Sequence, residues 1–497
     1  MKGTAGKGSE VRQQGQQRNR QKDNSTESQR GKVLILGGGC QQLPAIRKAR
    51  ELGLHVLVAD YNENPPGRAE ADEFHQISTT DREQILELAL REQVDGVMTF
   101  ASDPAQRTVS YVAEQLGLPG ESAESAEILG DKARLREYLR RLQIPTPRSM
   151  VLDGGAESLT TISDELESVP FPLLIKPLRS SGSRGITLVE ELDHACLQAA
   201  YEKAAGIGAA GCAIAEEYIE YGYPHLIGGD IVVRDGRIAV LGLMDCIREE
   251  DHPLVPCGKI FPSAASDGQK EQIWQTLERV VQDLQIRNAE MNVELILGAD
   301  GRVFPIEIAL RAGGNGIPLL LSDALGMDLI QEGILLATRE EVRRQLKEDS
   351  SRDNCEWQDH EGENHEEDHE REEHQKAKAD SAKTDTMKRK RRYACDNSRY
   401  SGLLEADDAP AYVSYNLHAR QHGTFNGYTI APAWQEHLYR TELFKREGDP
   451  VEPYIDASGI IGVLYFRFDS REELEQLGRP EDGIGLVGGA ADQIDVP

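Results

Sequence analysis

The chain has 497 residues, of which 39% are apolar, and its formal net charge is -29. This length predicts several domains, while the acidic excess argues against nonspecific binding to nucleic acid or to an anionic membrane. Because no apolar run approaches the roughly 18 residues that span a bilayer, the amino terminus has no signal-peptide pattern and the seven cysteines lack metal-ligand or disulfide spacing, we expect a cytoplasmic protein with reduced thiols.

The first folded segment follows a polar tail, residues 1–31, which has no periodicity and is predicted to be disordered. A buried strand at 33–36, a turn of three glycines, a helix at 43–52 and a strand at 55–60 then come in that order. This order is typical of a Rossmann-like opening, so we expect an α/β domain over residues 32–124. A dinucleotide site is not favoured, because the glycine turn lacks the G-x-G-x-x-G fingerprint.

A second domain is predicted over residues 125–346, and two lysines stand out in its first half. Lys132 opens an amphipathic helix at 131–139, and Lys176 ends an apolar strand. A flexible hairpin rich in serine and glycine follows that strand, and its candidate phosphate-binding residues are Ser181, Gly182, Ser183 and Gly185. Backbone N–H groups and hydroxyls of such a loop can cradle phosphate oxygens, with the lysine as a point charge. The loop is not a Walker A motif, and an ordinary turn is the alternative.

An alternating strand at 213–219 carries the next candidates, Glu216, Glu217 and Ile219. By itself this segment is equally typical of an ordinary sheet edge. The order along the chain favours a functional interpretation: a lysine on a helix, a lysine before a serine and glycine loop, an acidic strand, and then a pair of glutamates.

The most informative segment holds that pair, Glu294 and Glu307, on two apolar runs joined by Asp300-Gly301. Asp-Gly between alternating runs predicts a hairpin, on which the two glutamates face the same side at similar heights. Two facing carboxylates suit Mg2+, which is usually held by one or two carboxylates plus substrate phosphates. Arg311 lies at an even offset from Glu307, so on a continuing strand it projects from the same face towards a phosphate or carboxylate. The alternative is a solvated hairpin with exposed charges.

The remainder of the chain begins with a charged segment at 347–398, predicted to be a disordered insert. Its histidines and its run of basic residues could bind a metal or an anionic partner weakly, and a solvated linker is the alternative. A small β-rich domain is expected at 399–480, with strands near 411–417 and 460–468 and a helix at 470–477, and residues 481–497 form a tail. The fold class is therefore α/β and α+β.

Taken in order, these motifs resemble the ATP-grasp superfamily, in its biotin carboxylase and carbamoyl-phosphate synthetase-like branch. The resemblance covers about residues 32–345 and 411–478 and implies a Rossmann-like pre-ATP-grasp domain, an ATP-grasp domain at 125–346 and a small C-terminal domain. It implies that ATP and Mg2+ are the cofactors. The implied roles are ATP phosphate binding by Lys132, Lys176 and the loop, base and ribose contacts by Glu216, Glu217 and Ile219, Mg2+ binding by Glu294 and Glu307, and stabilisation of the transferred phosphoryl group by Arg311.

One position departs from the family pattern. Members commonly carry Asn two residues after the second glutamate as a further metal ligand, whereas this chain has Ala309 there. Asn315 is an alternative oxygen donor, although a Gly-Gly-Asn turn equally suits a backbone that needs positive φ. Metal binding is therefore expected to be looser or remodelled.

The function implied is ATP-dependent ligation of a small-molecule carboxylate, activated as an acyl phosphate, to an amine. Two alternatives remain: bicarbonate activation of the biotin carboxylase type, and a nucleotide-binding regulatory module that has lost catalysis. Arg248 is a further candidate for clamping a carboxylate, against an ordinary surface ion pair. The family suggests a homodimer, and the sequence does not identify either substrate.

Overall fold

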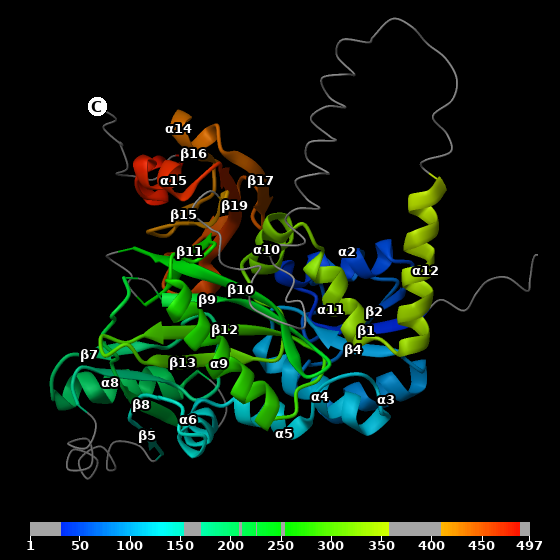
Figure 1. Cartoon of the computed structure of the whole chain (residues 1–497), viewed down its shortest axis with the longest axis horizontal. Helices are drawn as coiled ribbons and strands as arrows, with labels where there is room; N and C mark the ends of the chain where they lie inside the picture. Colours follow the sequence, from blue (N-terminus) through cyan, green and yellow to red (C-terminus); the bar gives the residue numbers. More distant parts are fainter. Residues whose placement is uncertain are drawn as a thin grey trace, which may run out of the picture.

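A computed structural model of the chain describes residues 31–153, 170–207, 211–224, 226–249, 254–356 and 409–487. Its elements build an amino-terminal α/β domain, a small four-stranded sheet, and one large sheet that runs from the middle of the chain into the carboxy-terminal region (Figure 1). Within the described residues, no helix is both long enough and apolar enough to cross a membrane.

The amino-terminal domain has a parallel sheet in the order β3-β2-β1-β4. The strands are β1 Lys32–Leu36, β2 His55–Asp60, β3 Glu73–Gln76 and β4 Gly96–Thr99. On one face pack α2 Leu43–Glu51 and α11 Leu329–Ala337, and on the other α3 Arg82–Glu92 and α4 Asp103–Leu116. Helices on both faces explain why the run 33–36 is apolar throughout rather than alternating. The predicted Rossmann-like fold is confirmed.

The small sheet is antiparallel, in the order β5-β8-β6-β7, and carries the segments predicted to hold phosphates. Its strands are β5 Ser149–Leu152, β6 Leu173–Pro177, β7 Thr187–Val189 and β8 Ala213–Glu217. One face is covered by α8 His194–Ala205, whose apolar residues join the core of this sheet. The serine and glycine loop is the connection of the β6-β7 hairpin, as expected.

The large antiparallel sheet has eight strands in the order β13-β12-β9-β10-β11-β14-β19-β17. They are β9 Leu226–Arg234, β10 Arg237–Arg248, β11 Pro256–Phe261, β12 Ala289–Leu297, β13 Val303–Ala309, β14 Ala411–His418, β17 Leu438–Leu443 and β19 Ile460–Phe468. The long helix α9 Asp267–Asp283 packs against the β9–β13 part of the sheet. The carboxy-terminal region is thus β-rich as predicted, but its main strands continue this sheet instead of forming a separate one.

Further helices connect these layers. They are α5 Ala123–Leu129, α6 Lys132–Arg141, α10 Ile317–Leu325, α12 Glu340–Glu356, α14 Pro432–Gln435, α15 Arg471–Leu477 and α16 Pro480–Gly483. Short pieces complete the fold: η1 Cys40–Gln42, η2 Pro66–Ala69, η3 Ala457–Gly459, β15 Gly423–Thr424, β16 Tyr428–Ile430, β18 Pro450–Val451 and β20 Ile484–Leu486.

Two helices cross the expected domain boundaries. The boundary at residue 124 falls inside α5. This helix begins at Ala123 because the side chain of Ser122 accepts a hydrogen bond from the N–H of Ser125 and caps it. The boundary at 346 falls inside α12, which continues to Glu356 because residues 340–356 contain no glycine or proline. The structure does not describe residues 357–398, so the histidine and basic runs of the predicted insert lie outside the described residues, as do residues 1–30.

The expected tail also begins later than residue 481, since β20 pairs with β16 and Ala431 N donates to Gly483 O. A strand of three residues is too short to be recognised from a period in the sequence. β20 forms because β16 is there to pair with it.

Candidate functional site

The paired glutamates meet as the hairpin predicts. Glu294 on β12 lies directly opposite Glu307 on β13, and Gly301 in the connecting turn has a φ of +78°. The two side chains are 30% and 26% exposed, so both carboxylates remain accessible.

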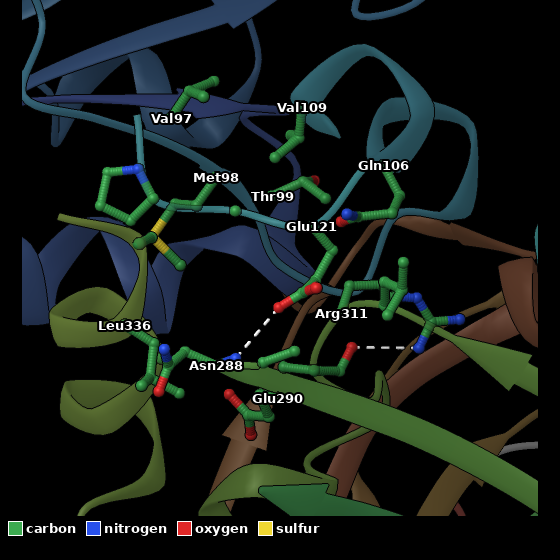
Figure 2. A pocket seen from close by; sticks show the side chains of 17 residues that line it. Val97, Met98, Thr99, Gln106, Val109, Glu121, Asn288, Glu290, Arg311 and Leu336 are labelled. Carbon is green, nitrogen blue, oxygen red and sulfur yellow. Dashed lines mark hydrogen bonds between the residues drawn. The ribbon is translucent and has the colours of Figure 1, made fainter. Parts of the chain in front are cut away.

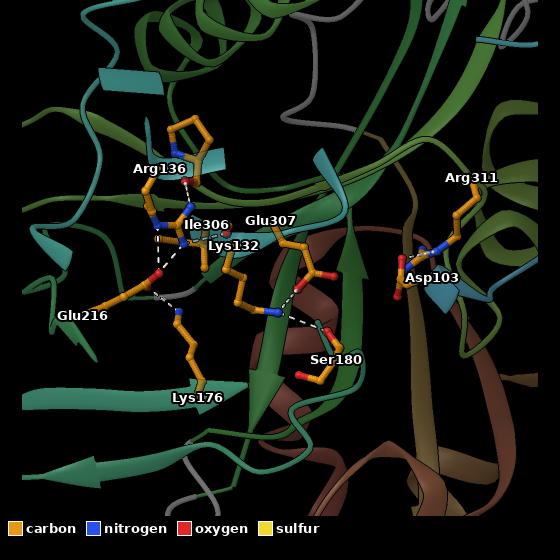
Figure 3. Close-up of polar contacts among 10 residues, drawn as sticks. Asp103, Lys132, Arg136, Lys176, Ser180, Glu216, Ile306, Glu307 and Arg311 are labelled. Atoms are coloured by element: carbon orange, nitrogen blue, oxygen red, sulfur yellow. Dashed lines mark hydrogen bonds and ion pairs between the residues drawn. The ribbon is translucent and has the colours of Figure 1, made fainter. Parts of the chain in front are cut away.

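Each glutamate of this pair has a lysine beside it. Lys132 Nζ lies 3.9 Å from Glu307 Oε2 and donates to Ser180 O at 3.0 Å, so it joins the glutamates to the glycine-rich loop (Figure 3). Lys259 Nζ, on β11, lies 3.9 Å from Glu294 Oε1 and 2.7 Å from Cys246 Sγ. Burial raises the pKa of Glu307; the positive charge of Lys132 opposes this rise, and the charge of Glu294 adds to it. A divalent cation between the carboxylates would relieve this repulsion.

Lys176 stands beside this group in a buried ion triad. Its Nζ lies 2.5 Å from Glu216 Oε2, and Arg136 Nε donates to Glu216 Oε1 at 3.0 Å (Figure 3). Arg136 is fully buried, and its Nη2 donates to Ile306 O at 2.8 Å, so it fastens the small sheet to the strand that carries Glu307. Burial alone would raise the pKa of Glu216, but the two cations outweigh it and lower that pKa to about 2. Burial and the neighbouring charge of Arg136 lower the pKa of Lys176, against the attraction of Glu216.

The serine and glycine loop, residues 180–185, arches beyond Lys132 and touches the carboxy-terminal region. Its turn is tight, with positive φ at Gly182, Ser183 and Gly185. Gly182 O accepts a hydrogen bond from Ala457 N in η3 at 3.0 Å. The loop is therefore held by two segments that are distant in the sequence, Lys132 before it and η3 after it.

Two candidates for contacting the nucleotide base, Glu217 and Ile219, lie in different surroundings. Glu217 pairs with the exposed Arg148, at 3.3 Å between Oε2 and Nε. Ile219 is buried in an apolar cluster with Leu226, Ile296 and Phe304 on the large sheet.

Arg311 differs from its predicted placement. Strand β13 ends at Ala309, and the guanidinium makes a bidentate pair with Asp103 of α4, with Nε–Oδ1 at 2.8 Å and Nη2–Oδ2 at 2.6 Å. Beyond the strand, Asp230 on β9 accepts a hydrogen bond from the N–H of Gly313. Arg311 therefore joins the two domains. In Figure 3 it lies beside Asp103 and apart from Lys132 and Lys176, although its charge still opposes, to a small extent, the rise that burial causes in the pKa of Glu307.

A small cavity of about 70 Å³ lies beside Arg311, between the amino-terminal domain and β12. Figure 2 shows Glu121 hydrogen-bonded to Asn288 on one wall and Glu290 on another. Glu290 Oε1 is buried without a hydrogen-bond partner, and burial, with the charge of Asp230, raises the pKa of this carboxyl. The cavity is separate from the lysines, so we assign it no part in phosphate binding.

Sequence reasoning missed three residues of this arrangement: Arg136, Lys259 and Asp103. Each sits on a regular element whose pattern is explained by its apolar neighbours. The one available signal was Lys259, a charged side chain within the largely apolar strand β11.

The donor set fits a magnesium and phosphate site. Two opposed carboxylates offer the hard oxygen ligands that Mg2+ prefers, and the lysines offer positive charge to the phosphates that usually complete its coordination. In the described part of the chain, no group of three or more His, Cys, Asp or Glu side chains forms an all-protein metal cage. The arrangement is thus compatible with a cation whose remaining ligands are phosphate oxygens and water.

Comparison with known proteins agrees with this chemistry. An ATP-grasp N-terminal domain model matches residues 46–120, and an ATP-grasp domain model matches residues 129–315. The chain therefore contains an ATP-grasp N-terminal domain and an ATP-grasp domain.

Three similar proteins illustrate the relationship. The formate-dependent phosphoribosylglycinamide formyltransferase of Thioalkalivibrio sulfidiphilus is 28% identical over 219 residues, which are 42% of this chain and 54% of the relative. The chain thus spans about half the length of this curated relative. The structure of an L-amino acid ligase from Bacillus licheniformis superposes with a TM-score of 0.65 at 19% identity, covering 92% of this chain and 98% of that one. The biotin carboxylase domain dimer of the Hydrogenobacter thermophilus 2-oxoglutarate carboxylase, in complex with MgADP and bicarbonate, gives 0.62 at 19% identity, covering 92% and 90%.

Proposed function

We propose that this protein is an ATP- and Mg2+-dependent ligase that activates a carboxylate as an acyl phosphate and joins it to an amine. The observation that carries the proposal is the glutamate pair, with Lys132 and Lys259 each within 4 Å of one of its carboxylates. The matches to the two ATP-grasp domain models support it. Mg2+ held by Glu294 and Glu307 would supply charge neutralisation at the phosphate oxygens.

The side chains are assigned roles by their position. Lys132, Lys176 and the N–H groups of Ser181, Gly182, Ser183 and Gly185 bind the phosphates. The backbone near Glu216, Glu217 and Ile219 contacts the base. Arg311 stabilises the transferred phosphoryl group, for which its guanidinium must share or exchange the partner that it has in Asp103.

The reaction proceeds in two displacements. A carboxylate oxygen of the acid attacks the γ-phosphorus of ATP, the bond from that phosphorus to the bridging oxygen breaks, and ADP leaves with the electron pair. The amine nitrogen then attacks the acyl carbon, inorganic phosphate leaves, and the nitrogen loses a proton to solvent. Lysines and Arg311 stabilise the charge on the phosphoryl oxygens electrostatically, so no nucleophilic side chain is needed.

A second candidate is bicarbonate activation, which the similarity to the 2-oxoglutarate carboxylase domain favours. The two candidates share the phosphate site and differ in the acid, so one assay separates them. ADP release is measured with pooled carboxylic acids and amines, each alone and together, and with bicarbonate alone, and condensed products are identified by mass spectrometry.

We expect ADP release that requires both an acid and an amine. Stimulation by bicarbonate alone would replace the ligase with the carboxylase, and no stimulation by any acid would favour the regulatory module. Glu307→Gln is expected to abolish the stimulated release, because it removes one of the two carboxylates. Asp300→Asn is the matched control, since Asp300 lies in the turn of the same hairpin and accepts hydrogen bonds from the neighbouring Arg302.

Assembly and location belong to the proposal as well. We propose a homodimer, supported by the dimeric carboxylase domain of similar fold, and light scattering on the purified protein tests it. A cytoplasmic location is supported by the free thiols at Cys40, Cys196, Cys246 and Cys257.

A further inference from the structure

The glutamate pair gives two carboxylates to a cation that prefers six oxygens. The oxygen donor considered after Ala309, Asn315, is engaged elsewhere. Its Oδ1 accepts from Gln41 Nε2 at 3.1 Å, and its N donates to Gln41 Oε1 at 2.8 Å, so it ties the amino-terminal domain to the turn after β13. Asn315 is therefore not a metal ligand in this arrangement.

Another amide lies on the same face of the hairpin. Asn292 on β12 pairs directly with Ala309 on β13, just as Glu294 pairs with Glu307 two positions further along. Side chains two residues apart on a strand point the same way. The four positions form the corners of a rectangle in which three side chains carry oxygen and the fourth is a methyl group.

The amide of Asn292 is oriented by the neighbouring strand. Its Nδ2 donates to Asp230 Oδ1 at 2.8 Å and to Gly229 O at 3.1 Å, so both N–H bonds point towards β9. Asp230 is itself fully buried and fixed by the N–H of Gly313. Since the amide group is planar, its carbonyl oxygen is directed away from β9 and towards the side on which Ala309 of β13 lies.

From this geometry we propose that Asn292 Oδ1 is a third protein ligand of the Mg2+ ion held by Glu294 and Glu307. An amide oxygen is a hard, neutral donor, so it adds coordination without adding to the repulsion between the two carboxylates. Directly opposed side chains have Cβ atoms about 4.5–5.5 Å apart, so an amide on either strand reaches the same space. The inference rests on the proposed function, because it completes the cation site on which that function depends.

Mn2+ binding in the presence of ADP, followed by electron paramagnetic resonance, tests the ligand without requiring turnover. We expect Asn292→Ala to weaken Mn2+ binding about 10- to 100-fold. Ala309→Asn in the Asn292→Ala background should restore it, because the amide is returned from the opposite strand. Asn292→Asp should retain binding, since it keeps an oxygen while losing the N–H donors to Asp230. Far-UV circular dichroism and urea denaturation of each variant report whether it folds.

The outcomes separate the inference from the proposed function. Unchanged Mn2+ binding in Asn292→Ala, with a loss in Glu307→Gln, would overturn the amide ligand and leave the glutamate site standing. If Asn292→Asp loses binding as Asn292→Ala does, or Ala309→Asn restores nothing, Asn292 acts by holding Asp230 and the proposal is wrong. Unchanged binding in Glu307→Gln would remove the cation site and both proposals with it.

Discussion

Glu216→Gln tests whether the buried triad holds the nucleotide lobe to the glutamate hairpin. Glu216 is 1% exposed and is the shared partner of Arg136 and Lys176. The substitution keeps the shape of the side chain and removes its charge, leaving two cations in a buried setting.

The expected loss of stability follows from the usual cost of breaking a buried ion pair and from the pKa shift of Glu216. Breaking one side of a buried ion pair typically costs about 3–5 kcal/mol, because the remaining charge has no partner. The lowering of the Glu216 pKa from 4.5 to about 2 corresponds to a contribution of about 3 kcal/mol at neutral pH. We therefore expect a decrease of about 3–5 kcal/mol in the free energy of unfolding at pH 7.

The adjacent residue provides the control. Glu217 makes the same kind of pair with Arg148, whose side chain is 61% exposed, so Glu217→Gln should cost less than about 1 kcal/mol. Because the pKa of Glu216 is lowered in the folded protein, its contribution is complete above pH 4.5 and is lost as the pH falls towards about 2. The difference between wild type and Glu216→Gln should shrink over that range.

Urea denaturation of the three proteins, followed by circular dichroism between pH 7 and pH 3, makes the measurement. Equal midpoints for Glu216→Gln and Glu217→Gln at pH 7 would refute the reasoning, since burial is what distinguishes the two positions. A difference from wild type that stays constant down to pH 3 would show that the charge of Glu216 is not the cause.

Two further predictions concern glycines with positive φ. Gly316→Ala should destabilise the protein by more than about 2 kcal/mol, because the added Cβ would collide with the hydroxyl of Tyr465. Gly301→Ala should cost only the backbone strain of about 1–2 kcal/mol, because no atom lies within 4 Å of the added Cβ. Thermal denaturation compares the two variants, and similar melting temperatures would contradict this prediction. Gly182→Ala would place a Cβ 2.6 Å from a side chain of η3 and should release the serine and glycine loop, which limited trypsin digestion detects as faster cleavage after the exposed Arg184, while an unchanged rate would show that η3 does not hold the loop.

The sequence alone was enough to predict contacts between residues that are close together along the chain. The Asp300-Gly301 turn between alternating runs was enough to bring Glu294 opposite Glu307, because turn type and a period of two fix the register of a hairpin. The buried run at 33–36 likewise identified the central strand of the Rossmann-like sheet. Both features depend on residues that are near one another along the chain.

The tertiary structure decided what lies between distant segments. Arg311 meets Asp103 across 208 positions, and Arg136 meets Glu216 across 80, and neither pairing leaves a period or a spacing in the sequence. The carboxy-terminal strands join the large sheet because β11 leaves an edge that β14 can pair, a property of the assembled sheet rather than of either strand. The sequence determined which side chains could face one another within a hairpin. The packing of separate elements determined which buried charges found a partner. A buried charge is stable only when it is paired, and that pairing depends on the whole fold.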